Sequence, residues 1–331
     1  MLRIGRRLGI VVGFGLAAGM LSAPPAAATT GATLPFSTFA RLAVDGAHGL
    51  EFVSGGPGTS SLAVFDTSGD PVETIPMQGA SGMALVGSTL YVAEADAPDI
   101  AIVDTSAQPP AVVGALDIGT FTQPSDLTYV SGRLWFFTAT GLAAVRPDGT
   151  ELAGPFYVGA GYQPWFADGL EGGAELAMFD SGLSPATLYQ YRASVPPVLL
   201  GQTWSVGGSD DAGQMAVVPG HSTMMLAADY PHAYPEIRGV DAATLRSYAA
   251  GPYPTAVATS SADGGMIAGG ALGLDGPDVW AYGFGQTTSF FSYDFGGTDV
   301  WTMPRGIAWS ADGSEIFVVA SGAAGTNPTF N

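Results

Sequence analysis

The sequence contains no cysteine and no lysine, and only three of its 331 residues are histidine. Without cysteine there are no disulfides, no thiolate metal sites and no cysteine nucleophile. A zinc site needs several converging His, Cys or carboxylate ligands, so the scarcity of histidine argues against one, and we expect neither a metal nor another cofactor. The only asparagines are Asn327 and Asn331. We interpret this composition as the codon bias of a GC-rich bacterial genome.

Basic side chains are also scarce, and this sets the net charge. Ten arginines oppose 29 acidic residues, which gives a formal net charge of −19. Such a charge repels nucleic acid and anionic membrane surfaces, so we expect neither as a partner. Apolar residues make up 47% of the chain and aromatic residues 11%, which is typical of a packed globular protein.

The first 28 residues have the order of a secretory signal peptide. Arg3, Arg6 and Arg7 precede an apolar run over residues 8–21, and small residues follow up to Ala28. The run is too short to span a bilayer comfortably. We predict cleavage after Ala28 and secretion of residues 29–331 as a single domain. No later segment is long and apolar enough for an anchor, so we expect no membrane insertion after cleavage.

A repeat dominates the rest of the chain. A short apolar strand, a turn with Asp and Gly, a second apolar strand and a third strand recur seven times, with 38 to 50 residues between copies. The predicted first strands are Leu42–Val44, Met83–Leu85, Leu127–Tyr129, Trp165–Ala167, Met215–Val217, Val257–Thr259 and Ile307–Trp309. Four short strands per copy without helical periodicity predict an all-β fold, a seven-bladed β-propeller of four-stranded blades.

The two ends of the chain bear on closure of this ring. The seventh copy begins at Arg305, and the sequence reaches Asn331 before a full third strand is visible, so we expect an incomplete last blade. Residues 33–37 precede the first copy, and we expect them to supply the outer strand of the last blade. Such pairing would close the ring and cover an exposed sheet edge.

The repeat resembles the YVTN-repeat propellers of bacterial surface-layer and secreted proteins. The best copies are residues 82–93 and 306–319, and residues 44–56 resemble a first blade of secreted actinobacterial members. The resemblance implies the propeller fold but no single activity, because related propellers include lactonases, dehydrogenase subunits and adhesins. We find no Gly-x-Ser-x-Gly elbow, phosphate-binding loop or dinucleotide fingerprint, and we identify no catalytic residue.

The predicted turns and loops indicate where a ligand would bind. His48 and His221 belong to turns after first strands, which places them on the face opposite the usual ligand funnel of a propeller. The loops that enter first strands share the funnel face with the loops that join second to third strands, and both sets are rich in aromatic residues and proline. The candidate binding residues are Tyr162, Trp165, Asp229, Tyr230, His232, Tyr234, Tyr253 and Trp301.

These aromatic residues allow two interpretations: a rim that stacks on sugar rings or cations, or wedges packed between blades. We expect an exported, monomeric binding module without catalytic activity, whose ligand is a cell-wall glycan, a peptide or a protein. One alternative is an enzyme of the lactonase or quinoprotein-related propeller type. Another is a structural module of a truncated surface protein.

Overall fold

The structure is a computed structural model, and it describes residues 31–159, 164–166, 174–180, 187–204, 211–218, 225–230, 236–240, 245–249, 254–260, 264–271, 276–286, 288–296, 300–321 and 328–331. Every regular element in these ranges is a β-strand, as the sequence predicts. Across the same ranges there is no helix with the length and apolar character needed to cross a membrane.

The strands of the described residues form four-stranded antiparallel sheets, seven in number. The first sheet consists of β2 (Arg41–Asp45), β3 (Leu50–Ser54), β4 (Ser61–Asp66) and β5 (Pro71–Pro76). The second consists of β6 (Ala80–Val86), β7 (Thr89–Glu94), β8 (Asp99–Asp104) and β9 (Ala111–Asp117). The third consists of β10 (Ser125–Val130), β11 (Arg133–Thr138), β12 (Gly141–Val145) and β13 (Ala153–Phe156). The fourth sheet consists of β14 (Pro164–Phe166), β15 (Glu175–Asp180), β16 (Thr187–Arg192) and β17 (Val198–Trp204). The fifth consists of β18 (Asp211–Val217), β19 (Met225–Tyr230), β20 (Glu236–Val240) and β21 (Leu245–Ala249). The sixth consists of β22 (Pro254–Thr259), β23 (Met266–Ala271), β24 (Val279–Gly283) and β25 (Phe291–Tyr293).

The last sheet combines both ends of the described chain. Its order is β26 (Thr302–Trp309), β27 (Ile316–Ala320), β28 (Thr329–Phe330) and β1 (Ala32–Thr33). The expectation of an incomplete last blade is therefore wrong, because the short strand β28 supplies the third strand. The outer strand of this sheet is β1, which pairs with β28 through Ala32 opposite Phe330. This strand covers residues 32–33, whereas the sequence predicted residues 33–37.

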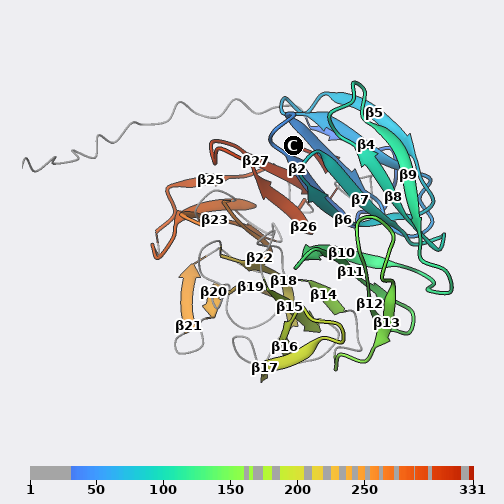
Figure 1. The fold of residues 1–331 in the computed structure, drawn as a ribbon. Helices are drawn as coiled ribbons and strands as arrows, with labels where there is room; N and C mark the ends of the chain where they lie inside the picture. The colour runs from blue at the N-terminus through green and yellow to red at the C-terminus, as the bar shows by residue number, and fades with distance from the viewer. Residues whose placement is uncertain are drawn as a thin grey trace, which may run out of the picture.

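The sheets surround a common centre, and one edge strand of each sheet is innermost (Figure 1). Strands β2, β6, β10, β14, β18, β22 and β26 are these inner strands, and β26 contacts β2. Adjacent sheets bury apolar faces against each other; one such cluster joins Phe52 and Leu62 of the first sheet to Met83 and Val92 of the second. Four-stranded sheets arranged around a centre define a β-propeller.

The strand predictions agree with the structure except at a few boundaries. Six of the seven predicted first strands lie entirely within inner strands, because alternating apolar residues and tight Asp-Gly turns specify hairpins locally. The exception is the copy at residues 165–167, since β14 covers Pro164–Phe166.

The outer strands carry exposed apolar residues at β-bulges. In β5, β9 and β17 the register skips Val72, Val113 and Leu200, which are 40%, 64% and 42% exposed. A bulge bends and twists an edge strand, which makes it a poor template for pairing with another chain. These exposed side chains therefore belong to protected sheet edges.

Candidate functional site

A group of polar side chains bridges inner strands at the centre of the ring, and Asp126 of β10 is its focus. Arg41 of β2 donates from Nη1 to Asp126 Oδ1 over 2.8 Å, and Nη2 of Arg305 in β26 donates to the same oxygen. The side chains of Arg41, Asp126 and Arg305 are only 12%, 2% and 9% exposed. Strands β2 and β6 separate β26 from β10 in the ring, so the second ion pair crosses the centre.

Backbone amides occupy the remaining acceptors of this group. Asp126 Oδ2 accepts the amide of Phe166 at 2.6 Å. Oε1 of Gln214 in β18 accepts the amides of Arg305 at 2.7 Å and Val257 at 3.3 Å. We call Arg41, Asp126, Phe166, Gln214, Val257 and Arg305 the axial network. It connects inner strands of six sheets, and charge-assisted hydrogen bonds of this kind are the stronger ones in proteins.

β-Bulges aim two of these side chains. The β10–β11 register shifts between Ser125 and Leu127, and the β26–β27 register shifts between Thr302 and Ile307. At these shifts Asp126 and Arg305 adopt φ values of +34° and +66°, a region that non-glycine residues rarely enter. Such a conformation persists only where the surroundings hold it, and it is common at ligand sites.

Close packing of β6 against β10 holds Asp126 in place. A Cβ atom on Gly82 would lie 2.4 Å from Cα and the carbonyl carbon of Asp126. No side chain fits at such a distance, so the approach of these two inner strands requires glycine at position 82.

A second buried carboxyl group lies where the sixth sheet meets the last one, at the end where the inner strand β26 begins. Asp278, immediately before β24, is 1% exposed; its Oδ2 accepts the amide of Phe295 at 2.8 Å. Its Oδ1 has no hydrogen-bond partner among the described residues. Burial, with a smaller contribution from Asp294, raises the pKa of Asp278 to about 6. Thr302 of β26 donates from Oγ1 to the Asp278 carbonyl at 3.1 Å, which links this group to the start of the last inner strand.

The structure places four of the eight predicted binding residues. Trp165 lies within β14, beside Phe166 of the axial network. Asp229 and Tyr230 end β19, where they pair with Ala212 and Asp211 at the start of β18. All three backbone positions, like Trp301 before β26, lie at the end where inner strands begin. The other four, Tyr162, His232, Tyr234 and Tyr253, lie outside the described residues.

The side chains of Trp301 and Phe121, from two of the loops that enter inner strands, are described. Trp301 is half-buried, and its backbone donates to Ser321 Oγ at 3.0 Å and accepts the Ser321 amide at 2.7 Å. Phe121 is half-buried and packs edge-on against Phe136, with ring centroids 6.3 Å apart, at the border of the apolar cluster between the second and third sheets.

The histidine prediction is confirmed at His48, which lies in the β2–β3 turn with Nδ1 2.7 Å from Asp45 Oδ2. His221 lies outside the described residues. In the part of the chain that the structure describes, no group of three or more His, Cys, Asp or Glu side chains is arranged to hold a metal ion.

Sequence reasoning missed the axial network and Asp278. One signal was present: Arg41, Asp126 and Gln214 each directly precede a predicted apolar first strand, and Arg305 stands two residues before another. Polar residues at corresponding positions of several copies indicate a shared location. What they touch could not be derived, because each contact joins residues 40 to 179 positions apart.

Comparisons with known proteins identify the fold alone. No family model matches the chain, and no curated protein matches it. Among solved structures, hydrazine synthase of Kuenenia stuttgartiensis aligns with a TM-score of 0.67 and 11% identity, covering 95% of this chain and 99% of that chain. The structure of U3-55K aligns with a TM-score of 0.62 and 12% identity, covering 89% of this chain and 94% of that chain. These likenesses agree with a β-propeller.

Proposed function

We propose that this chain is an exported, seven-bladed β-propeller of the YVTN-repeat type that acts as a non-catalytic binding module. Its ring is closed by the pairing of β1 with β28, and its ligand surface is the funnel face, where inner strands begin. The seven sheets and the β1–β28 register support the closure. The signal-like residues 1–28 support export.

The observation that carries the binding proposal is the axial network. It includes Phe166, next to Trp165 in β14, and Arg305, four residues after Trp301. The hydrogen bond of Phe166 and the buried ion pair of Arg305 both tie these strands to Asp126 of β10. Rigid support reduces the ordering cost of a binding surface. Aromatic residues held next to the axial network would supply contact area for a glycan, a peptide or a protein segment.

The test begins with an array of cell-wall glycans and peptides probed with the secreted protein. Trp165→Ala and Trp301→Ala are then measured against every ligand that binds. Loss of an anchoring aromatic residue at a binding hot spot costs about 2 kcal/mol or more, so we expect affinity to fall at least tenfold. His48→Ala, in a turn at the opposite face, is the matched control and should bind like the wild type.

Thermal unfolding of each variant separates binding from packing. If both tryptophan variants fold normally and bind as well as the wild type, the funnel-face proposal is wrong. If they bind poorly only because their melting temperatures fall, the aromatic side chains are wedges between sheets.

A structural module is the second candidate function, and the saturation of the axial network favours it. Both carboxylate oxygens of Asp126 and Oε1 of Gln214 already accept hydrogen bonds from the protein. A purely structural propeller would show no ligand on the arrays, while substitutions in the axial network would still lower its stability.

A further inference from the structure

Glu51 is a buried acid in the middle of the first sheet. It lies in β3 with 0% exposure, and neither of its carboxylate oxygens has a hydrogen-bond partner among the described residues. An ionised carboxylate in such surroundings loses its hydration without compensation, which is strongly unfavourable. The side chain must therefore be stabilised in another way.

The register of the first sheet shows where this side chain points. Glu51 pairs with Val44 of β2 and Phe65 of β4, and directly opposite residues share one face of a sheet. Val44 and Phe65 pack in the cluster that joins the first sheet to the last, together with Phe317 and Phe330. Glu51 consequently faces the contact between the first and last sheets, which we call the seam.

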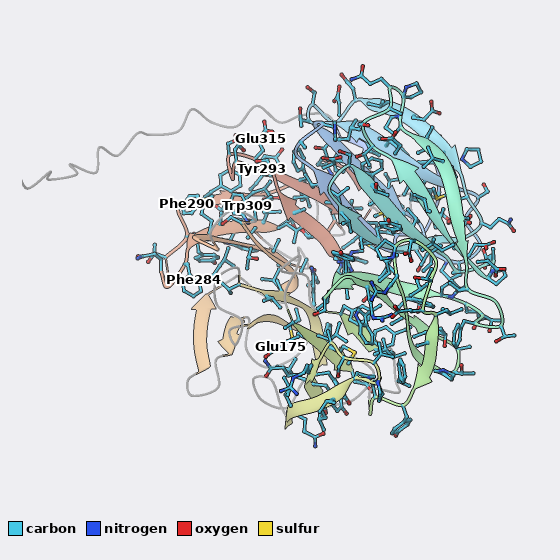
Figure 2. All side chains as sticks on the ribbon, in the orientation of Figure 1. Glu175, Phe284, Phe290, Tyr293, Trp309 and Glu315 are labelled. Atoms are coloured by element: carbon cyan, nitrogen blue, oxygen red, sulfur yellow. The ribbon has the colours of Figure 1, made fainter. Side chains whose placement is uncertain are left out.

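The charged groups that act on Glu51 are also acids. Asp66 ends β4, and Glu315 directly precedes β27 in the last sheet (Figure 2). Strands β27 and β28 carry no ionisable side chain. The side chain of Asp45 in β2 lies on the opposite face of the first sheet, away from the seam, and contacts His48. Burial first, then Asp66 and Glu315, raise the pKa of Glu51 to about 8.

We propose that Glu51 is a neutral carboxylic acid in the folded protein and that its ionisation weakens the seam, so that closure of the ring depends on pH. An uncharged carboxyl group is tolerated in an apolar contact far better than a carboxylate. As the pH rises, a negative charge would develop between the first and last sheets, where Asp66 and Glu315 already disfavour the charged form of Glu51.

The direction of the pH effect follows from proton binding. The folded chain retains a proton that the unfolded chain releases near pH 4.5. The contribution of Glu51 to stability is therefore complete below pH 4.5 and falls as the pH rises to about 8. One extra bound proton lowers the folding equilibrium constant by about tenfold per pH unit across this window.

The experiment compares urea unfolding of the wild type and Glu51→Gln between pH 5 and pH 9. Glutamine cannot ionise, so the ratio of the two folding constants should shift against the wild type by about tenfold per pH unit until pH 8. Glu51→Leu serves as a second non-ionising variant in case the amide disturbs folding. Glu175→Gln, at an exposed position of β15 in another sheet, is the control and should follow the wild type.

Hydrogen exchange locates the effect. Amides of β1, β28 and β3 should exchange faster in the wild type than in Glu51→Gln at pH 8.5, after correction for the intrinsic pH dependence. Parallel pH curves for the wild type and both Glu51 variants would overturn the proposal, as would equal exchange at the seam. Stabilisation by calcium chloride that requires Glu51, with parallel pH curves, would show a bound cation and overturn it too.

Discussion

Arg305 and Asp126 form an ion pair across the centre of the ring although 179 positions separate them in the chain. Both residues have positive φ values, and both lie at β-bulges of inner strands. Arg41 and Arg305 each connect Asp126 to a sheet that is not its neighbour in the ring. A buried pair of this kind specifies one arrangement of the sheets, because any other arrangement would leave its charges without these partners.

Replacement of Asp126 by Asn should strongly destabilise the fold. Asparagine keeps the shape but removes the charge that both guanidinium groups face, and breaking a buried ion pair typically costs about 3–5 kcal/mol. The free energy of unfolding from urea titration measures this loss. Asp70→Asn, at an exposed position of the β4–β5 turn, provides the control and should leave stability unchanged. A small effect at Asp126 would mean that water solvates the centre of the ring.

Replacement of Gly82 by Ala should destabilise through overpacking. The added methyl group would lie 2.4 Å from backbone atoms of Asp126 and Leu127, which cannot rotate away. Overpacking of this type costs about 1–3 kcal/mol. Gly201→Ala in β17 is the matched control, because nothing lies within 4 Å of the position that its methyl group would take. Equal melting temperatures for the two variants would contradict the close approach of β6 and β10.

The carboxyl group of Asp278 should make stability fall as the pH rises from about 4 to about 6. Its folded pKa of about 6 lies above the ordinary value of 3.8, so its contribution is present below pH 3.8 and lost through pH 6. Melting temperatures of the wild type and Asp278→Asn across this range provide the test. The wild type should lose stability relative to the variant, and a constant difference between them would show that Asp278 is ionised throughout.

Protein secreted by the native host should begin near residue 29. The charged, apolar and small-residue regions of residues 1–28 have the order that signal peptidase requires. Intact-mass spectrometry of the secreted material gives the N-terminus directly. Detection of an intact Met1 would refute cleavage.

The sequence by itself determined the strands. Alternating apolar residues and Asp-Gly turns act within a few neighbouring residues, so Leu42–Val44 or Ile307–Trp309 could be identified as strands without knowledge of their partners. The same local signals placed His48 in a turn. They failed at the weak third strand of the last sheet, because a two-residue strand such as β28 depends on pairing with β1 and β27 and not on its own pattern.

The tertiary structure decided which polar residues meet. Asp126, Gln214 and Arg305 are polar residues near the starts of separate repeats, and no local rule brings them together. Their contacts require the ring arrangement of the sheets, and bulges at Asp126 and Arg305 then turn these side chains toward the centre. Burial of Glu51 likewise depends on the last sheet packing against the first. Long-range packing sets the desolvation of such groups and the charges around them. A sequence pattern with a period of a few residues does not predict that packing.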